Sequence, residues 1–172
     1  MYYVRKLSKP NNYEKVKLAE SIEDINSDVL KQELSTTFDT LSFWKCNDLD
    51  NMDDTIKAIL LSTNKIDKSK FIVLDSELVK KYDLDVEESI GKTGYKGFEN
   101  LHIDISNLTY KKIGEILKAY KESFEEDMYQ KELSKTEIKE LIKEVNEEQK
   151  IDFDNIDDHL KKDIMKILNP SN

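Results

Sequence analysis

The sequence predicts an α+β fold, in which a small sheet of about four short strands packs against amphipathic helices and a C-terminal helical hairpin follows. Three observations predict this fold. The segment Phe98–Glu126 joins a strand pattern directly to a long amphipathic helix pattern. Other short runs of β-branched and aromatic residues alternate with segments of helical spacing. The 172 residues contain only 4 Gly and 2 Pro, which argues against a loop-rich β-sandwich.

The segment Phe98–Glu126 is expected to supply the spine of the core. Its first part alternates apolar and polar residues, which is the period of a half-buried strand, over Leu101, His102, Ile103, Asp104 and Ile105. Its second part carries one apolar stripe at helical spacing, formed by Ile113, Ile116, Leu117, Tyr120 and Phe124. Ser106, Asn107 or Thr109 can cap this helix, because a short side-chain oxygen accepts from the free N–H groups of the first turn.

The N-terminal part is expected to hold two strands and one short helix. Tyr2–Leu7 is predicted to be a strand and residues 13–26 a loop. Asn26 or Ser27 can cap a short helix that ends at Leu34. The next strand, Thr40–Cys46, should place on one face Leu41, Phe43 and Lys45, and on the other Ser42, Trp44 and Cys46.

Two helices and a strand are expected in the middle of the chain. The acidic stretch Asp48–Asp54 precedes a helix that ends near Asn64, and acidic residues in a first turn favour the helix dipole. Phe71–Leu74 is a continuous apolar run, which is typical of a strand buried on both faces. Asp75, or the serine after it, can cap a short helix to Tyr82.

Two helices are expected at the C-terminus. Ser134–Glu137 has the capping-box pattern, in which two side chains satisfy each other's backbone N–H groups. The apolar stripe of this helix consists of Ile138, Leu141, Ile142 and Val145. Asp154 or Asn155 can cap the last helix, and Asn169–Pro170 is expected to end it.

The length of the chain favours one domain with an appendage. We expect residues 1–130 to form the α+β core domain and residues 131–172 to form the helical hairpin. The apolar face of the hairpin indicates that it either packs on the core or docks to a partner.

Composition argues against several classes of function. The net charge of −9 disfavours binding to nucleic acid through its phosphates and suits a partner protein with a basic surface. Cys46 is the only cysteine, so neither a disulfide framework nor a CxxC metal site is expected. The chain shows neither an apolar signal core nor an apolar run of about 20 residues. We therefore expect a cytoplasmic protein with no membrane partner, no metal and no cofactor.

His102 and Asp104 are the candidate catalytic residues. Two positions apart on a strand, they should point to the same face, where a His and a carboxylate can bind a metal or transfer a proton. The only other histidine, His159, lies in a charged segment, which leaves too few ligands for a zinc site. A polar strand face is the simpler interpretation. Cys46 with His102 as its base is another alternative, although a lone cysteine is usually a small buried hydrophobe.

Residues 83–97, which contain GKTGYKG, are predicted to form a flexible loop. Gly91 and the two residues after it resemble the end of a phosphate-binding P-loop, but that motif needs a second glycine at the position of Val86. Tyr95 in this loop and Trp44 are the candidate binding residues, because aromatic side chains are enriched at interfaces. Packing in the core is the alternative for Trp44.

Carboxylates cluster at four places in the chain: Asp48/Asp50/Asp53/Asp54, Glu87/Glu88, Glu125/Glu126/Asp127 and Asp152/Asp154/Asp157/Asp158. The last cluster lacks the glycine and distal glutamate of a calcium-binding loop. Charge at helix starts and solvation explain the clusters simply. The alternative is an acidic face that meets a basic partner or imitates a nucleic-acid backbone.

Together these features predict a small acidic, cytoplasmic protein-binding module, such as an accessory, inhibitor, immunity or antitoxin-like protein of a bacterium or mobile element. The Lys-, Asn-, Ile- and Asp-rich composition is typical of proteins from AT-rich genomes. The alternative is an enzyme, a hydrolase or transferase, with its site around His102 and Asp104. A nucleic-acid-associated factor is a third interpretation, which the net charge disfavours. The sequence favours a binding protein over an enzyme.

Overall fold

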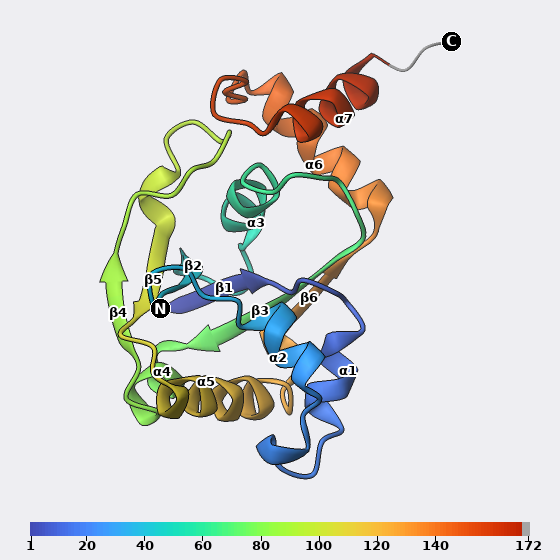
Figure 1. Cartoon of the computed structure of the whole chain (residues 1–172). Helices are drawn as coiled ribbons and strands as arrows, with labels where there is room; N and C mark the ends of the chain where they lie inside the picture. Colours follow the sequence, from blue (N-terminus) through green and yellow to red (C-terminus); the bar gives the residue numbers. More distant parts are fainter. Residues whose placement is uncertain (170–172) are drawn as a thin grey trace.

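The computed structural model describes residues 1–169, apart from the side chain of Asp127, and contains one six-stranded antiparallel sheet with helices on both faces (Figure 1). The strands stand in the order β4 (Asp85–Glu88), β5 (His102–Ser106), β2 (Leu41–Cys46), β1 (Tyr2–Lys6), β3 (Ser69–Asp75) and β6 (Gln130–Leu133). The described residues form seven α-helices: α1 (Asn12–Lys17), α2 (Ser27–Glu33), α3 (Asp53–Leu60), α4 (Ser76–Lys81), α5 (Tyr110–Ser123), α6 (Lys135–Glu147) and α7 (Asp158–Leu168). The predicted α+β class is confirmed. The expectation of about four strands is wrong, because the sheet has six.

The two unexpected strands are the two edges of the sheet. β4 lies in the segment expected to be a loop and pairs with β5. β6 lies in the break expected before the C-terminal helices and pairs with β3. Each has four residues, most of them polar and incompletely buried. An edge strand of this kind lacks the apolar alternation by which a strand is recognised in a sequence.

The sheet separates two hydrophobic clusters, one on each face (Figure 1). Successive residues of β3 divide between them: Phe71 and Val73 belong to one cluster, and Ile72 and Leu74 to the other. The prediction of a strand buried on both faces is therefore confirmed. α5, α1 and α2 cover one face, and α3, α6 and α7 cover the other.

Most of the predicted helix starts are confirmed. The side chains that accept a hydrogen bond from a first-turn N–H in α2, α4, α5 and α6 are, in that order, Asn26, Asp75, Thr109 and Ser134. The start of α7 differs, because its cap is Asp157 rather than Asp154 or Asn155. Pro170, expected to end this helix, lies outside the described residues.

The segment 13–26 was expected to be a loop, but it contains most of α1 and a 3₁₀-helix at Ile22–Asp24. Tyr13 is buried, and its ring stands edge-on to Phe124 with centroids 4.6 Å apart. A helix of six residues spans less than two turns, so its periodicity is too short to detect in the sequence.

The GKTGYKG segment is partly buried, with Gly91, Thr93, Gly94 and Tyr95 inside and its two lysines and Gly97 exposed. It lies between α3 and the chain that leads into α7. Thr93 Oγ1 donates to the carbonyl of Ala58 over 2.7 Å, and the N–H of Asp152 donates to the carbonyl of Gly94 over 2.8 Å. A Cβ at Gly94 would overlap Ile156, so the close contact requires glycine.

The C-terminal helices share one hydrophobic cluster with α3 and the sheet. Their contributions to it are Ile138, Ile142, Val145, Leu160 and Ile164. The division into a domain of residues 1–130 and a hairpin of residues 131–172 stays a prediction. Within residues 1–169, no helix is long and apolar enough to cross a membrane.

Candidate functional site

His102 and Asp104 form a small polar cluster with two serines. Ser89 Oγ lies 2.7 Å from His102 Nδ1 and donates to Asp104 Oδ2 over 2.8 Å. Ser42 Oγ, on the neighbouring strand β2, donates to Asp104 Oδ1 over 3.0 Å. The predicted pair therefore lies on one face of β5, and Ser89 bridges its members across a Nδ1–Oδ2 distance of 4.0 Å.

The direction of these hydrogen bonds decides what the cluster can do. A hydroxyl group has one proton, and Ser89 donates it to Asp104. The 2.7 Å contact with His102 then requires a proton on His102 Nδ1, which donates to Ser89 Oγ. In a nucleophile–base pair the histidine must instead accept the serine proton. The arrangement thus matches a polar bridge between strands better than an activated serine.

The His102 ring packs beneath a glycine. It stands edge-on to Trp44 with ring centroids 5.0 Å apart, and its side chain is 13% exposed. A Cβ at Gly91 would lie 2.6 Å from His102 Cβ, so glycine allows the chain to cross the ring closely. Burial lowers the pKa of His102 below its usual 6.5, and the nearby Asp104 carboxylate opposes this shift.

The lowered pKa predicts a pH dependence of stability. Unfolding releases His102 to its usual pKa of 6.5, so the unfolded state takes up a proton more readily than the folded state. The free energy of unfolding should therefore fall as the pH decreases from 6.5 toward the lower, folded-state pKa. Denaturant unfolding of the native protein and His102→Gln from pH 8 to pH 5 measures this, and the decline due to His102 should be missing from the variant. Equal pH dependence in the two proteins would contradict the lowered pKa.

Trp44, Tyr95 and Cys46 are buried side chains. Trp44 is 5% exposed and Tyr95 is 0% exposed. The Cys46 thiol donates to the carbonyl of Asp48 over 3.0 Å, so its contact is with the backbone rather than with His102. Packing accounts for all three residues, and a role of Trp44 or Tyr95 in binding stays a prediction.

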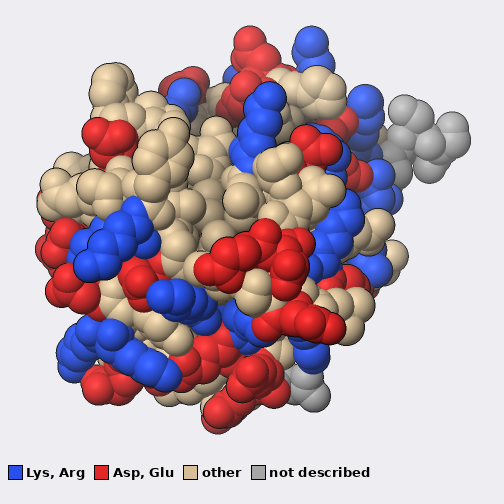
Figure 2. Space-filling model, turned by 60° about the horizontal axis from the view of Figure 1, so that its bottom comes forward, with Lys and Arg blue, Asp and Glu red and all other residues tan. Residues whose placement is uncertain are grey.

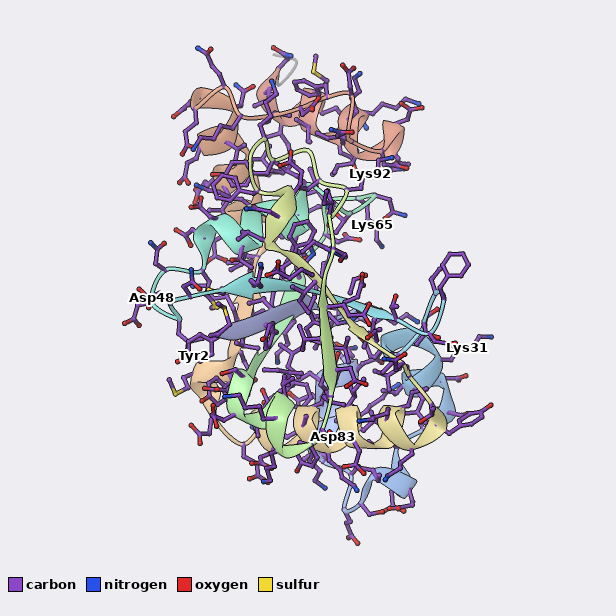
Figure 3. The ribbon with its side chains drawn as sticks, turned by 90° about the vertical axis from the view of Figure 1, so that its left-hand side faces the viewer. Tyr2, Lys31, Asp48, Lys65, Asp83 and Lys92 are labelled. Carbon is purple, nitrogen blue, oxygen red and sulfur yellow. The ribbon has the colours of Figure 1, made fainter. Side chains whose placement is uncertain are left out.

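The outer edge of β4 is an open sheet edge beside this cluster, because β4 pairs only with β5. In Figure 3, β4 runs down the side of the molecule that faces the viewer. The N–H of Ser89 donates to His102, and the register places Glu87 opposite Asp104. Alternate residues of an antiparallel pair bond to the partner strand, so the backbone groups of Val86 and Glu88 point away from β5. They are free to pair with another strand.

The side chains along β4 are acidic. Asp85, Glu87 and Glu88 are exposed, as is Ile90 just beyond the strand at 87%. Glu87 stands opposite Asp104, and like charges facing each other across a strand pair are destabilising. This distribution of charge is therefore not the most stable one for the sheet. We call the outward backbone of β4 with these four side chains the β4 edge.

Two exposed aromatic rings lie at the end of the sheet where β4 begins. Phe38 and Asp39 form the turn into β2 with φ values of 52° and 57°, which are unfavourable for a bulky residue. Phe38 is 94% exposed, and Tyr110 at the start of α5 is 95% exposed. A hydrogen bond of 3.0 Å from Leu108 N to Asp39 O joins the two segments. An exposed aromatic residue in a strained turn is a feature of contact sites.

The sequence interpretation missed the β4 edge and these aromatic residues. β4 has four residues, most of them acidic, so its sequence carries no strand signal. Only its pairing with β5 shows that it is a strand. Phe38 follows Thr-Thr and precedes Asp, so nothing in the local sequence indicates that a tight turn exposes it. The chain matches no protein-family model, no curated protein and no solved structure.

Proposed function

We propose that the chain is a protein-binding module whose β4 edge pairs with a basic, extended segment of a partner protein. The open backbone of β4 carries this proposal. Strand addition to a sheet edge uses main-chain hydrogen bonds for affinity and side-chain contacts for specificity. A function of this kind suits an accessory or inhibitor-type protein, including the immunity and antitoxin-like classes.

Charge supports a basic partner. Of the three carboxylates on β4, Glu88 forms a 2.8 Å ion pair with Lys45 and Glu87 accepts a hydrogen bond from Ser106. The Asp85 carboxylate has no hydrogen bond or ion pair with the described residues. Lysine or arginine side chains alternating along an added strand would therefore meet carboxylates along the whole β4 edge.

The face around α5 is less suited to this role. Figure 2 shows that acidic and basic side chains are interspersed over it. The structure pairs several of them directly, as in Lys81–Glu122 at 2.6 Å and Lys118–Glu115 at 2.9 Å. Many of the carboxylates on this face are thus already neutralised by lysines of the same chain. For this reason we place the contact with a basic partner at the β4 edge.

A proline substitution tests the backbone contact. Glu88→Pro removes an outward N–H without removing a hydrogen bond to β5, because residue 88 is a non-bonded position of the strand pair. We expect it to weaken binding of a peptide that alternates Val and Lys by about tenfold. Fluorescence anisotropy with the labelled peptide measures the affinity.

Glu88→Ala is the matched control, since it removes the same carboxylate and retains the N–H. It should weaken peptide binding by less than about threefold, as for an exposed ion pair. A peptide that alternates Val and Glu should not bind. Equal affinities of the Lys and Glu peptides, or equal losses in the two variants, would contradict pairing along β4.

A further inference from the structure

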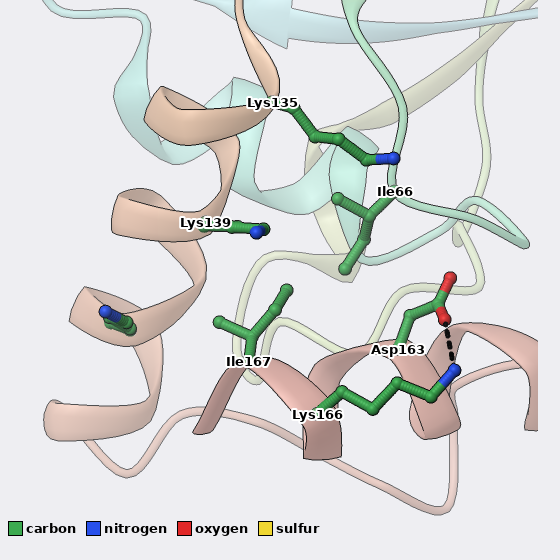
Figure 4. A pocket seen from close by; sticks show the side chains of 7 residues that line it. Ile66, Lys135, Lys139, Asp163, Lys166 and Ile167 are labelled. Atoms are coloured by element: carbon green, nitrogen blue, oxygen red, sulfur yellow. Dashed lines mark hydrogen bonds and ion pairs between the residues drawn. The ribbon is translucent and has the colours of Figure 1, made fainter. Parts of the chain in front are cut away.

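A cavity with a concentration of lysine side chains lies between α6 and α7 (Figure 4). Its volume is about 380 Å³, which lies within the range of small-molecule sites. We call it the lysine cavity, and its lining consists of Ile66, Lys135, Lys139, Lys143, Asp163, Lys166 and Ile167. In Figure 4, Lys135 and Lys139 come from α6, while Asp163, Lys166 and Ile167 come from α7.

The spacing of the lysines explains how they gather. Lys135, Lys139 and Lys143 are four residues apart, so they follow one stripe along α6. The neighbouring stripe, with Ile138 and Ile142, is buried in the core and fixes the rotation of the helix. Like charges at this spacing destabilise a helix. The row therefore does not arise from a requirement of helix stability.

The positive charge of the lysine cavity is only partly balanced. Its one carboxylate, Asp163, lies 3.4 Å from Lys166. Lys135 lies 3.9 Å from Asp67. The side-chain ammonium groups of Lys139 and Lys143 have no ion pair or hydrogen bond with any of the residues that the structure describes. In a chain with a net charge of −9, four lysines and one carboxylate around one cavity are a local reversal of sign.

The cavity also has an apolar part. Ile66, in the loop before β3, is 7% exposed, and Ile167 of α7 is half-buried beside it. A ligand that fits both parts needs anionic groups and an apolar body. Lys135 and Lys143 are eight positions apart, or about 12 Å along the helix axis. This length suits a row of phosphates better than a single anion.

We propose that the lysine cavity binds a small organic phosphate, with two or more linked phosphate groups along α6 and an apolar body against Ile66 and Ile167. Lysine binds phosphate as a point charge, and its flexible stem tolerates small changes in ligand position. This site is separate from the β4 edge, and the two proposals do not depend on each other.

Isothermal titration calorimetry at low ionic strength with three probes tests the proposal. ATP supplies both linked phosphates and an apolar ring system, pyrophosphate supplies only the phosphates, and adenosine supplies only the ring. We expect ATP to bind, pyrophosphate to bind more weakly, and adenosine to show no binding. Moderate salt should weaken the binding of ATP, because the lysines are in contact with solvent.

The decisive variant is Lys139→Gln combined with Lys143→Gln. Glutamine keeps a long side chain and high helix propensity while it removes both unpaired charges. We expect this pair of changes to weaken ATP binding by about tenfold or more. Lys31→Gln with Lys111→Gln makes the same change of net charge at exposed sites on α2 and α5, on the opposite face of the sheet from the lysine cavity. This control should leave ATP affinity within about twofold.

Three results would overturn the proposal: no binding of ATP or pyrophosphate, an equal loss of affinity in the two double variants, or adenosine binding as tight as that of ATP. ATP binding no tighter than that of pyrophosphate would overturn the apolar contact with Ile66 and Ile167. Circular dichroism of each double variant confirms that the helices are intact before binding is compared.

Discussion

Tyr95→Ala should lower the free energy of unfolding by about 3–5 kcal/mol. The Tyr95 ring is fully buried and stacks on Phe98, with centroids 4.1 Å apart and planes 5° from parallel. Its backbone forms a β-bridge with Ile151, so the residue joins the GKTGYKG segment to the chain before α7. Truncation would leave a cavity where these parts meet. Equilibrium unfolding in urea measures the change.

Two further variants separate packing from hydrogen bonding. Tyr95→Phe keeps the ring and removes the hydroxyl with its 2.8 Å hydrogen bond to Asp54 Oδ1, so the loss should be about 1–2 kcal/mol. Tyr110→Ala is the exposed control and should change stability by less than about 0.5 kcal/mol. A loss below about 1 kcal/mol in Tyr95→Ala would contradict a central packing role for the ring.

The same unfolding curves test the boundary at residue 130. Tyr95 contacts Ile151 from one side and Asp54 of α3 from the other. If residues 1–130 and 131–172 unfold together, Tyr95→Ala shifts one transition. If the hairpin unfolds by itself, the variant should separate the curve into two transitions, the first of them from the C-terminal helices.

Elements with long or strict hydrophobic periods could be predicted from the sequence. The alternation in β5 and the stripe of α5 follow from burial of one face, which repeats along each element. β3 was recognisable for the opposite reason, because burial on both faces leaves no polar position from Phe71 to Leu74. In each case the hydrophobic pattern of the element itself shows which of its faces are buried.

β4 and β6 could not be predicted because their structure depends on a partner strand. Each has one open edge and four mostly polar residues, so the local sequence carries no signal of burial. The same limit applies to the polar cluster. Strand periodicity predicts that His102 and Asp104 point to the same face. Ser42 and Ser89 reach them only because β4, β5 and β2 are neighbours in the sheet.

The partial burial of the GKTGYKG segment was unpredictable for a different reason. Glycine and polar residues indicate a loop, and most loops are exposed. Here two of the three glycines allow a close approach: Gly91 adjoins His102 and Trp44, and Gly94 adjoins Ile156. Along the sequence, both neighbours of Gly91 are more than ten residues away from it, and Ile156 is farther still from Gly94. A local pattern contains no information about them.

Glu33→Ala is the second change with a large expected effect, and we expect it to lower the free energy of unfolding by about 3 kcal/mol. Glu33 is 2% exposed. Its carboxylate accepts hydrogen bonds from Asn12 Nδ2 at 2.6 Å, Ser8 N at 2.8 Å and Lys9 N at 3.2 Å. Ser8 and Lys9 lie in the turn after β1 and Asn12 is the first residue of α1, so one side chain joins the turn to the helix. Its removal takes the acceptor from the buried Asn12 side chain and from the partly buried N–H groups of Ser8 and Lys9.

Glu33→Gln and Glu14→Ala complete this experiment. Glutamine retains one acceptor but turns an N–H₂ group toward backbone donors, so we expect about half of the stability loss of Glu33→Ala or more. Glu14 lies exposed on α1, and its replacement should change stability by less than about 0.5 kcal/mol. Urea unfolding gives the free energies, and amide exchange of Ser8 and Lys9 gives the local effect. Fast exchange at these two amides in Glu33→Ala, with β1 still protected, would show that the carboxylate holds the turn; unchanged exchange would assign the turn to the packing of α1 alone.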